Sequence, residues 1–515
     1  MPMKSKKIFL PIVCIAFCLV FFATSCCKDN KLVILHTNDT HSQIIPGDDG
    51  LGGVMRRMAV IDSVRKAEKN VLLVDAGDAV QGSLYFFLYG GQVEQEIMNI
   101  LGVDARILGN HEFDNGIDSL ATILAQSNSP KISTNYNLEN TPLKDMFEPY
   151  IIKEYGGKRI GIIGINLDPT GIISKGNYDG LEFLPIVATA NLAAGILKNA
   201  AGVDAVIALT HIGYNPSGLV GDSILATNSR NIDIIIGGHS HDTIDPTTEK
   251  GAMRSSLINL DGQEVLVVQA GKAGRNIGKI EINLDSLGKG GRPKYELIRV
   301  DARYDDYYDS RLAAVVDKYS IGVDSLMHLW VGESPRLLND KDNGLLNYFA
   351  DFVFESAKGY APGIDLSIAN KGGLRAAIPE GKFSKGHVIN MVPFANFLTV
   401  VDVKGSDLLD VFNVMAVTDG NGVSKNVAAK YIKDDSGARV TEVKINGKAI
   451  TADKVYRVAT IDYLAKGGDY MTGLTRGNVV AQSKKAIFNE LLDYISDGKG
   501  GVIGCDTVPR WNIEK

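Results

Sequence analysis

Short apolar runs, each followed directly by polar residues, recur along the first half of the chain. These runs occupy residues 32–35, 71–74, 107–108, 206–209 and 232–236. Aliphatic, often β-branched runs of this kind predict buried strands. Longer stretches at 53–67 and 186–201 predict helices between the strands. Strands and helices therefore alternate, which predicts an α/β fold.

The polar residues that end these runs form one expected cluster, because ligands bind at the carboxyl ends of strands in such sheets. In order along the chain they are Asp39 and His41; Asp78; Asn110, His111 and Asp114; His211; and His239 and His241. Five of the eight histidines lie in this set, and of the other three His36 is predicted to be a packed core residue. Without His111 and Asp114, the set has seven side chains that offer imidazole, carboxylate or amide donor atoms, and none that offers a thiolate. Such a set suits a two-metal site with open positions. Asp78 has two oxygens and can bridge two cations.

Five short motifs in this set carry a family resemblance. Asp39-Thr40-His41, Gly77-Asp78, Asn110–Asp114, Thr210-His211 and Gly237–His241 resemble the motifs of calcineurin-like metallophosphoesterases. Gln81-Gly82-Ser83 narrows the resemblance to the bacterial 5′-nucleotidase branch. The resemblance implies a sandwich of β-sheets flanked by helices. It also implies two divalent metal ions, such as zinc or manganese. One would be held by Asp39, His41, Asp78 and His241, and the other by Asp78, Asn110, His211 and His239.

The ligands and the resemblance together imply a reaction. Two cations can lower the pKa of bound water towards about 7 and clamp an in-line displacement at phosphorus, so the expected attack is by a metal-activated hydroxide. His111 would stabilise the phosphoryl charge and the leaving alkoxide. Asp114 would orient the imidazole and favour its protonated form. The alternative for His111 is a further metal ligand or a structural residue.

The second half carries three more motifs. Asn370–Arg375, Pro393–Asn396 and Tyr463–Asp469 resemble the C-terminal domain of 5′-nucleotidases, an α+β substrate domain. The resemblance implies that Phe394 and Tyr463 sandwich the base, and such stacking is worth about 1–3 kcal/mol per base. The remaining expected substrate contacts are Asn396 with the base edge, Asp469 with the ribose hydroxyls and Arg375 with the phosphate. Taken without the family, Phe394 and Tyr463 are more often core aromatics. Lys371 departs from the usual pattern and adds charge beside the pocket.

The N-terminus is typical of a lipoprotein signal. It has lysines, then an apolar run at 8–22, then small residues ending at Cys26. This pattern predicts a signal peptide over 1–25 and a lipid on Cys26. The alternatives are an uncleaved anchor or an ordinary secretory cut. The predicted location is a bacterial cell envelope, anchored to the outer membrane on its periplasmic or surface face.

Charge and length narrow the class of protein further. The 515 residues carry a formal net charge of −6, which argues against a nucleic-acid polymer as partner. No obligate protein partner is evident. The length predicts two to four domains. We expect the signal at 1–25, a metallophosphoesterase domain at 31–300, a linker helix at 301–335 and the substrate domain at 336–515.

The leading functional hypothesis is a secreted, lipid-anchored two-metal phosphohydrolase that releases phosphate from nucleoside 5′-monophosphates. Within enzymes, the alternative is a UDP-sugar hydrolase or a 2′,3′-cyclic nucleotide 2′-phosphodiesterase. From another class, the alternative is a non-catalytic nucleotide-binding surface lipoprotein. The complete ligand set with His111 and Asp114 argues against a mere binder, which needs no catalytic groups.

Overall fold

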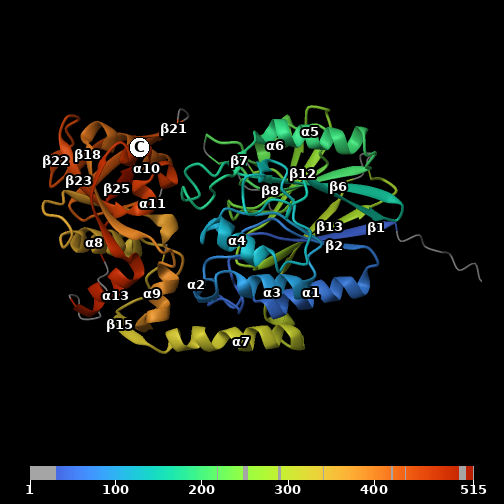
Figure 1. The fold of residues 1–515 in the computed structure, drawn as a ribbon, viewed down its shortest axis with the longest axis horizontal. Helices are drawn as coiled ribbons and strands as arrows, with labels where there is room; N and C mark the ends of the chain where they lie inside the picture. Colours follow the sequence, from blue (N-terminus) through green and yellow to red (C-terminus); the bar gives the residue numbers. More distant parts are fainter. Residues whose placement is uncertain are drawn as a thin grey trace, which may run out of the picture.

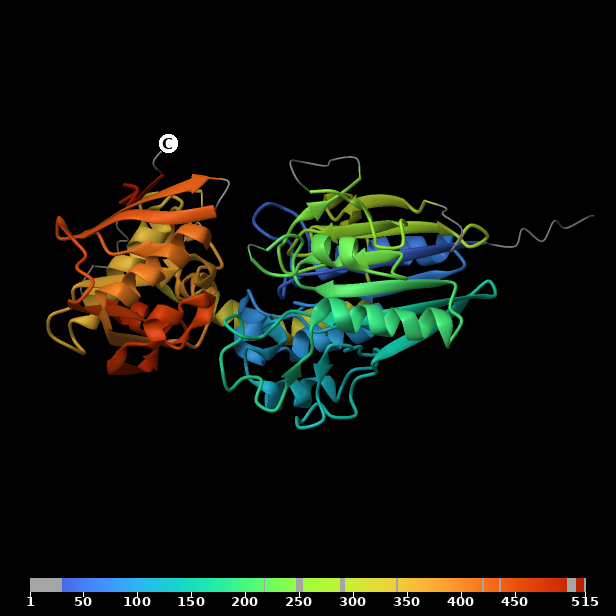
Figure 2. The same cartoon turned by 90° about the horizontal axis from the view of Figure 1, so that it is seen from above.

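The computed structural model describes residues 30–216, 218–246, 253–287, 292–339, 341–418, 421–434, 437–497 and 506–513. The predicted signal peptide and Cys26 lie outside the described residues. The chain forms two halves that lie side by side, one built from the N-terminal elements and the other from the C-terminal elements (Figures 1 and 2).

The first sheet of the N-terminal half has the strand order β14-β13-β1-β2-β3. Its strands are β1 (Lys31–Thr37), β2 (Val71–Asp75), β3 (Ala105–Arg106), β13 (Asn276–Asn283) and β14 (Lys294–Arg299). The strands β1, β2 and β3 are parallel, whereas β13 is antiparallel to β1 and to β14. The strand predicted at 107–108 begins two residues earlier than predicted, as β3, and Ile107 and Leu108 are buried residues that follow it.

The second sheet has the strand order β10-β12-β9-β8-β6-β5, with β11 paired to β12. Its strands are β5 (Tyr150–Tyr155), β6 (Lys158–Asn166), β8 (Ala205–His211), β9 (Ile234–Ile236), β10 (Thr243–Ile244), β11 (Ser256–Ile258) and β12 (Glu264–Ala270). Its centre, from β6 through β8 and β9 to β12, is parallel. The short strands β4 (Tyr136–Asn137) and β7 (Glu182–Phe183) pair with each other.

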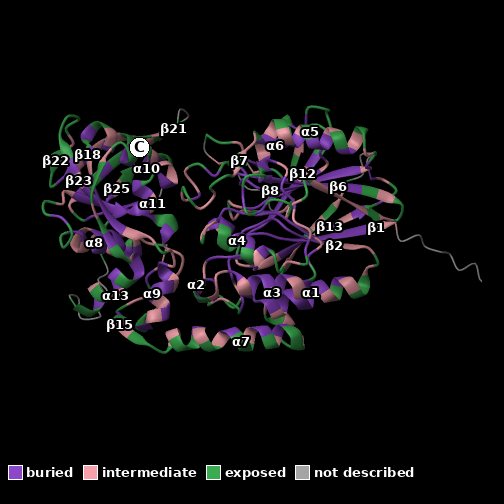
Figure 3. Cartoon of the chain, in the orientation of Figure 1, coloured by how far each residue is buried: buried purple, intermediate pink, exposed green. Residues whose placement is uncertain are grey.

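The two sheets pack face to face and helices cover their outer faces. Ile34 and Val74 of the first sheet share one core with Ile162 and Leu209 of the second. The covering helices are α1 (Val54–Ala67), α2 (Leu84–Tyr89), α3 (Gln92–Leu101), α4 (Ile117–Leu124), α5 (Ile186–Asn199) and α6 (Asp222–Asn228). Figure 3 shows the strands buried and the outer helix faces exposed. The predicted α/β sandwich flanked by helices is confirmed. His36 is fully buried and stacked on Tyr295, as predicted.

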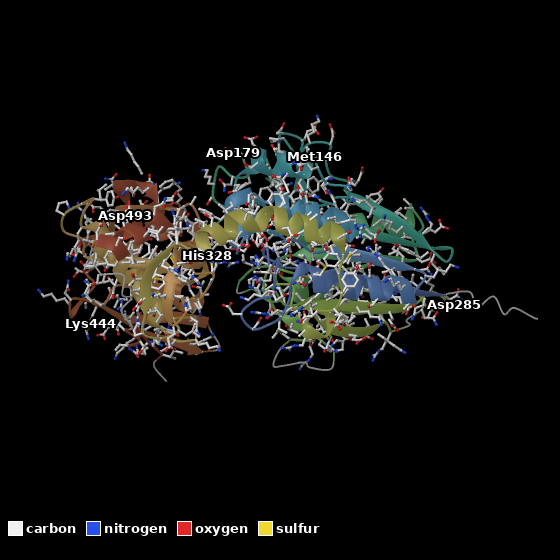
Figure 4. The ribbon with its side chains drawn as sticks, turned by 90° about the horizontal axis from the view of Figure 1, so that it is seen from below. Met146, Asp179, Asp285, His328, Lys444 and Asp493 are labelled. Atoms are coloured by element: carbon white, nitrogen blue, oxygen red, sulfur yellow. The ribbon has the colours of Figure 1, made fainter. Side chains whose placement is uncertain are left out.

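Helix α7 (Ser310–Met327) runs along the first sheet's helices and reaches the C-terminal half (Figure 1). It begins after Asp309, whose carboxylate accepts the N–H groups of Arg311 and Leu312. Leu312, Val315, Tyr319 and Val323 are buried in the core that contains α1 and α3. The helix predicted as a linker is therefore packed on the N-terminal half over most of its length. His328 follows its end, where the two halves meet (Figure 4).

The C-terminal half is a mixed α+β structure around one core. Its main sheet has the order β19-β16-β23-β18-β24, and a second sheet has the order β22-β21-β20-β25. The strands are β15 (Trp330–Ser334), β16 (Leu366–Asn370), β17 (Gly381–Ser384), β18 (Phe397–Lys404), β19 (Asn421–Val423), β20 (Val427–Asp434), β21 (Gly437–Ile445), β22 (Lys448–Ala449), β23 (Val455–Ile461), β24 (Asn478–Ala486) and β25 (Trp511–Ile513). The helices are α8 (Gly344–Ala357), α9 (Lys385–Met391), α10 (Gly405–Thr418), α11 (Asp462–Ala465), α12 (Thr472–Thr475) and α13 (Ile487–Asp497). Within the described ranges, no helix combines the length and apolar character needed to span a bilayer.

Candidate metal centre

The strand ends of both sheets meet at one edge of the sandwich and bring the predicted ligands together. Asp39, Asp78 and Asn110 follow β1, β2 and β3 of the first sheet. His211 ends β8, and His239 follows β9, in the second sheet. Three groups of side chains have all their donor atoms within 4.8 Å of one another: Asp39, His41 and His241; His41, Asp78 and His111; and Asp78, His211 and His239.

The first group has the geometry of side chains that face one ion. The Nε2 atoms of His41 and His241 lie 2.9 Å apart. Oδ1 of Asp39 is 3.4 Å from Nε2 of His241 and 3.8 Å from Nε2 of His41. His41 and Asp39 are buried, and His241 is partly exposed.

The second group is centred on Asp78. Its Oδ2 lies 3.1 Å from Nε2 of His211. Nδ1 of His239 lies 2.9 Å from Oδ1 of Asn110. Asp78 also contacts the first group through the His41–Asp78–His111 cluster, so its carboxylate is the side chain that both groups share.

Five of the seven predicted ligands have left-handed backbone conformations. The φ angles are 48° for Asp39, 48° for His41, 53° for Asp78, 78° for His239 and 60° for His241. Such conformations cost non-glycine residues on the order of 1–3 kcal/mol each, and they cluster at functional sites. The strained turns direct the metal-binding atoms of these side chains toward one point. Gly109 permits the close approach, since a Cβ there would lie 2.1 Å from Oδ1 of Asp78.

The donor set fits divalent metal ions. Nδ1 of His211 lies 2.7 Å from the carbonyl oxygen of Ala76, and a carbonyl can only accept. A proton is therefore on Nδ1, and Nε2 is the ring atom that a metal ion would use in place of its proton. That Nε2 atom is buried, and although it is 3.1 Å from Asp78 it does not meet hydrogen-bond geometry with a described residue. A buried imidazole nitrogen that faces a carboxylate at this distance fits a cation that both side chains would bind.

His111 and Asp114 form a pair beside the ligands. Nδ1 of His111 lies 2.9 Å from Oδ2 of Asp114. The backbone N–H of His111 donates to Oδ1 of Asp78 at 2.9 Å. Burial by itself lowers the pKa of His111, but the carboxylates of Asp114 and Asp78 outweigh burial, so its net pKa is raised. The raised pKa favours an imidazolium, which can donate through Nε2.

Glu112 is a residue of the site to which the sequence interpretation gave no role. Its Oε2 accepts the N–H groups of Gly109 at 2.6 Å and Asp78 at 3.1 Å, and its Oε1 accepts that of Ala79 at 2.9 Å. One buried carboxylate thus holds the loop after β2 against the loop after β3. The sequence shows only an acid between the predicted site residues His111 and Asp114; its burial and its three donors are known from the structure.

Two predicted substrate residues lie close to the candidate site: Phe394 beside His111, and Arg375 facing the acidic residues. The ring centroid of Phe394 is 6.0 Å from that of His111. The charge of Arg375 acts on Asp78, Asp114 and Asp39 across the boundary between the halves. Its guanidinium has no hydrogen bond or ion pair with the residues that the structure describes.

Tyr463 and Asp469 form a separate pair. The Tyr463 hydroxyl lies 2.9 Å from Oδ1 of Asp469 and 3.2 Å from the carbonyl oxygen of Ile172 in the N-terminal half. Asn396 lies two residues after Phe394, in the same turn before β18. The roles of Arg375, Phe394, Asn396, Tyr463 and Asp469 in binding stay predictions.

Comparisons with known proteins identify both halves. Residues 32–243 match the calcineurin-like phosphoesterase family, and residues 329–476 match the 5′-nucleotidase C-terminal domain. The fold and the donor set therefore define a calcineurin-like metallophosphoesterase with a 5′-nucleotidase C-terminal domain.

Whole-chain relatives agree with this assignment. The chain is 29% identical to a trifunctional nucleotide phosphoesterase protein of Bacillus subtilis over 90% of its own length, and it spans 34% of that longer protein. It is 28% identical to a 5′-nucleotidase of Rattus norvegicus, with 86% and 84% of the two chains covered. The crystal structure of a 5′-nucleotidase precursor from Thermus thermophilus matches with a TM-score of 0.84 and 29% identity, covering 94% of this chain and 99% of that one. The chain belongs to the 5′-nucleotidase family of hydrolases.

Proposed function

We propose that this hydrolase uses two divalent metal ions to release phosphate from nucleoside 5′-monophosphates. The main support is the position of Phe394 and Arg375. Both come from the C-terminal half and lie close to His111 and the acidic metal ligands of the N-terminal half. A phosphate at the ligands would thus have its nucleoside beside the aromatic turn. The names of the relatives support nucleotides as the substrate class.

The residues divide the work as follows. Asp39, His41, Asp78 and His241 would hold one metal, and Asp78, Asn110, His211 and His239 the other. When bound, the metals supply an activated water and positive charge at phosphorus. Arg375 binds phosphoryl oxygens through its planar donor fork. As the P–O5′ bond breaks, His111 donates the Nε2 proton to O5′, and Asp114 stabilises the imidazolium through Nδ1.

Phosphate release from a panel of substrates tests this function. The panel contains nucleoside 5′-monophosphates, nucleotide sugars, 2′,3′-cyclic nucleotides and an aryl phosphate, each measured with several metals. We expect the monophosphates to be preferred, chelation to abolish release and a divalent transition metal to restore it. Active enzyme with fewer than about one metal per chain would contradict the two-metal mechanism. A preference for another substrate class would contradict the substrate assignment.

We also propose that the chain is exported and anchored by a lipid on Cys26, in a bacterial outer membrane. The support is the sequence pattern of residues 1–26. Cys26→Ser should prevent palmitate labelling and leave the protein soluble or unprocessed. Labelling that persists in this variant would place the lipid elsewhere, with Cys27 the near candidate.

A further inference from the structure

Strand β12 of the second sheet supplies none of the candidate metal ligands, yet its last residues lie against the loop that carries two of them. The register of the sheet places Val268 of β12 beside Ile236, the last residue of β9. The chain continues from β9 into the loop at 237–242, which contains His239 and His241. The next residue of β12, Gln269, therefore lies where this loop begins, and its side chain is fully buried.

The side-chain amide of Gln269 bonds every second residue of this loop. Its Oε1 accepts the N–H of Asp242 at 2.6 Å and the hydroxyl of Ser240 at 3.3 Å. Its Nε2 donates to the carbonyl oxygen of Gly238 at 3.1 Å. Because an N–H can only donate and a carbonyl oxygen can only accept, these partners fix the orientation of the amide. One buried side chain thus holds residues 238, 240 and 242.

The two residues between these bonds are candidate ligands of different metal ions. Nδ1 of His239 lies 2.9 Å from Oδ1 of Asn110, whereas Nε2 of His241 lies 2.9 Å from Nε2 of His41. Both loop histidines have left-handed backbone conformations, with φ angles of 78° and 60°. Such conformations persist only where the surrounding structure holds them. The bonds of Gln269 on either side of each histidine supply this support.

The first two residues of the loop are glycines because the loop packs tightly on both sides. A Cβ on Gly237 would lie 3.3 Å from Nε2 of Gln269 and 2.1 Å from Oδ2 of Asp222. A Cβ on Gly238 would lie 3.0 Å from Oδ2 of Asp39. The loop therefore packs against the amide of Gln269 and against the carboxylate of a candidate ligand, so the position of the amide bears directly on the metal centre.

Asn38 connects the same end of β12 to Asp39. Its Oδ1 accepts the N–H of Ala270 at 2.9 Å. Its Nδ2 donates to the carbonyl oxygen of Gly271 and to Oδ2 of Asp39, each at 2.7 Å. The other carboxylate oxygen of Asp39, Oδ1, faces Nε2 of His241 at 3.4 Å. Asn38 thus bonds one oxygen of this carboxylate and leaves the other directed at the metal centre.

We propose that Gln269 is a positioning residue for both metal ions and that Asn38 is a positioning residue for one of them. Gln269 keeps His239 and His241 directed at different ions, whereas Asn38 orients Asp39, which serves a single ion. This inference rests on the two-metal centre of the proposed function. Loss of the Gln269 amide then weakens the binding of both ions, and loss of the Asn38 amide weakens the binding of one.

Withdrawal of Co²⁺ from the loaded full chain by a chelator of known affinity tests the inference, because the visible absorption of bound Co²⁺ depends on its ligands and their geometry. We expect Gln269→Met to weaken both binding steps by about 10- to 100-fold and to change the absorption of both ions, and Asn38→Leu to weaken one step. Gln269→Asn keeps a buried amide with a shorter reach and replaces Gln269→Met if that variant does not fold.

The matched control is Asn259→Leu. Asn259 is also buried, and its Oδ1 accepts the N–H groups of Asp261 and Gln263 at 2.9 Å, just before the other end of β12. Its loss removes bonds to a loop that carries no candidate ligand. We expect this variant to lower Tm and to leave both Co²⁺ affinities and the absorption spectrum as in wild type.

The outcomes separate this inference from the proposed function. Fewer than two Co²⁺ ions per wild-type chain would contradict the two-metal centre itself. Two ions in wild type, with equal affinities in Gln269→Met and Asn259→Leu, would overturn the role of Gln269 alone, as would a loss confined to one binding step. Asn38→Leu that weakens both steps, or neither, would overturn the role of Asn38. A lowered Tm with an unchanged Co²⁺ spectrum would identify either residue as merely structural.

Discussion

Replacing Glu112 by glutamine should weaken metal binding without removing a ligand. The carboxylate accepts three backbone N–H groups, from Gly109, Asp78 and Ala79. Glutamine has nearly the same shape but only one acceptor oxygen. If that oxygen takes the place of Oε2, the amide NH₂ faces the N–H of Ala79, donor against donor. The loop that carries Asp78 then loses one of its fixed points.

The magnitude follows from the lost bond. A hydrogen bond to a charged group contributes about 1.5–3 kcal/mol. At 1.36 kcal/mol per factor of ten, losing one such bond weakens binding about 10- to 150-fold, if the metal requires the ordered loop. Residues that support metal ligands typically change affinity by about 10- to 100-fold, which is the same range.

Competition with a chromophoric chelator for zinc measures this affinity directly. The matched control is Glu94→Gln, also a buried glutamate, whose oxygens lack hydrogen-bond partners in the described chain. The hydroxyl of Ser42 faces Glu94 but does not meet hydrogen-bond geometry. An affinity within about threefold of wild type for Glu112→Gln, or an equal loss in the control, would refute the reasoning.

Three further predictions follow from the site and its surroundings. His111→Ala should lower kcat by about 10²-fold or more with metal content unchanged, and Asp114→Asn should cause a smaller loss of the same kind; elemental analysis showing metal loss would make His111 a ligand. Phe394→Ala and Tyr463→Ala should each lower kcat/KM for nucleotides by about 5- to 150-fold and leave aryl phosphate hydrolysis nearly unchanged, whereas equal losses would identify core aromatics. Burial raises the pKa of Glu94 from 4.5 to about 7. The folded state then binds this proton more tightly than the unfolded state, so stability falls as pH rises from about 5 to 8. Glu94→Gln should flatten this decline in Tm measured against pH, and an unchanged slope would contradict it.

The sequence predicts the strands of the N-terminal half where they are buried on both faces. The runs at β1, β2, β8 and β9 are continuous and apolar for this reason. Strands β13 and β14 were not predicted, because charges interrupt both of them, buried residues of β13 are interspersed with partly exposed ones, and no residue of β14 is buried. Nor does a local pattern indicate that β1 pairs with β13, which lies more than 230 residues further along the chain.

In the candidate site, the sequence predicted which side chains could bind a metal ion. It did not predict the residues that hold those side chains in position. Asp39 and His211 stand out because each metal-competent side chain follows or ends a strand. The role of Glu112 depends on which backbone N–H groups come near it in three dimensions. Asp and His adopt left-handed φ angles more often than most non-glycine residues, but the sequence does not show at which of them the turns require it.

The placement of the ligands on two sheets has a consequence for the order of folding. Asn110 and His239 are 129 residues apart, and His41 and His241 are 200 apart. The ligands of each proposed metal ion come from both sheets, so neither sheet alone can assemble the centre. During synthesis from the N-terminus, the ligand set is complete only after His241 has emerged and both sheets have docked. If the chain is exported unfolded, as proposed, it would acquire its metals at its destination, and the metal supply of that compartment would decide which ions it carries.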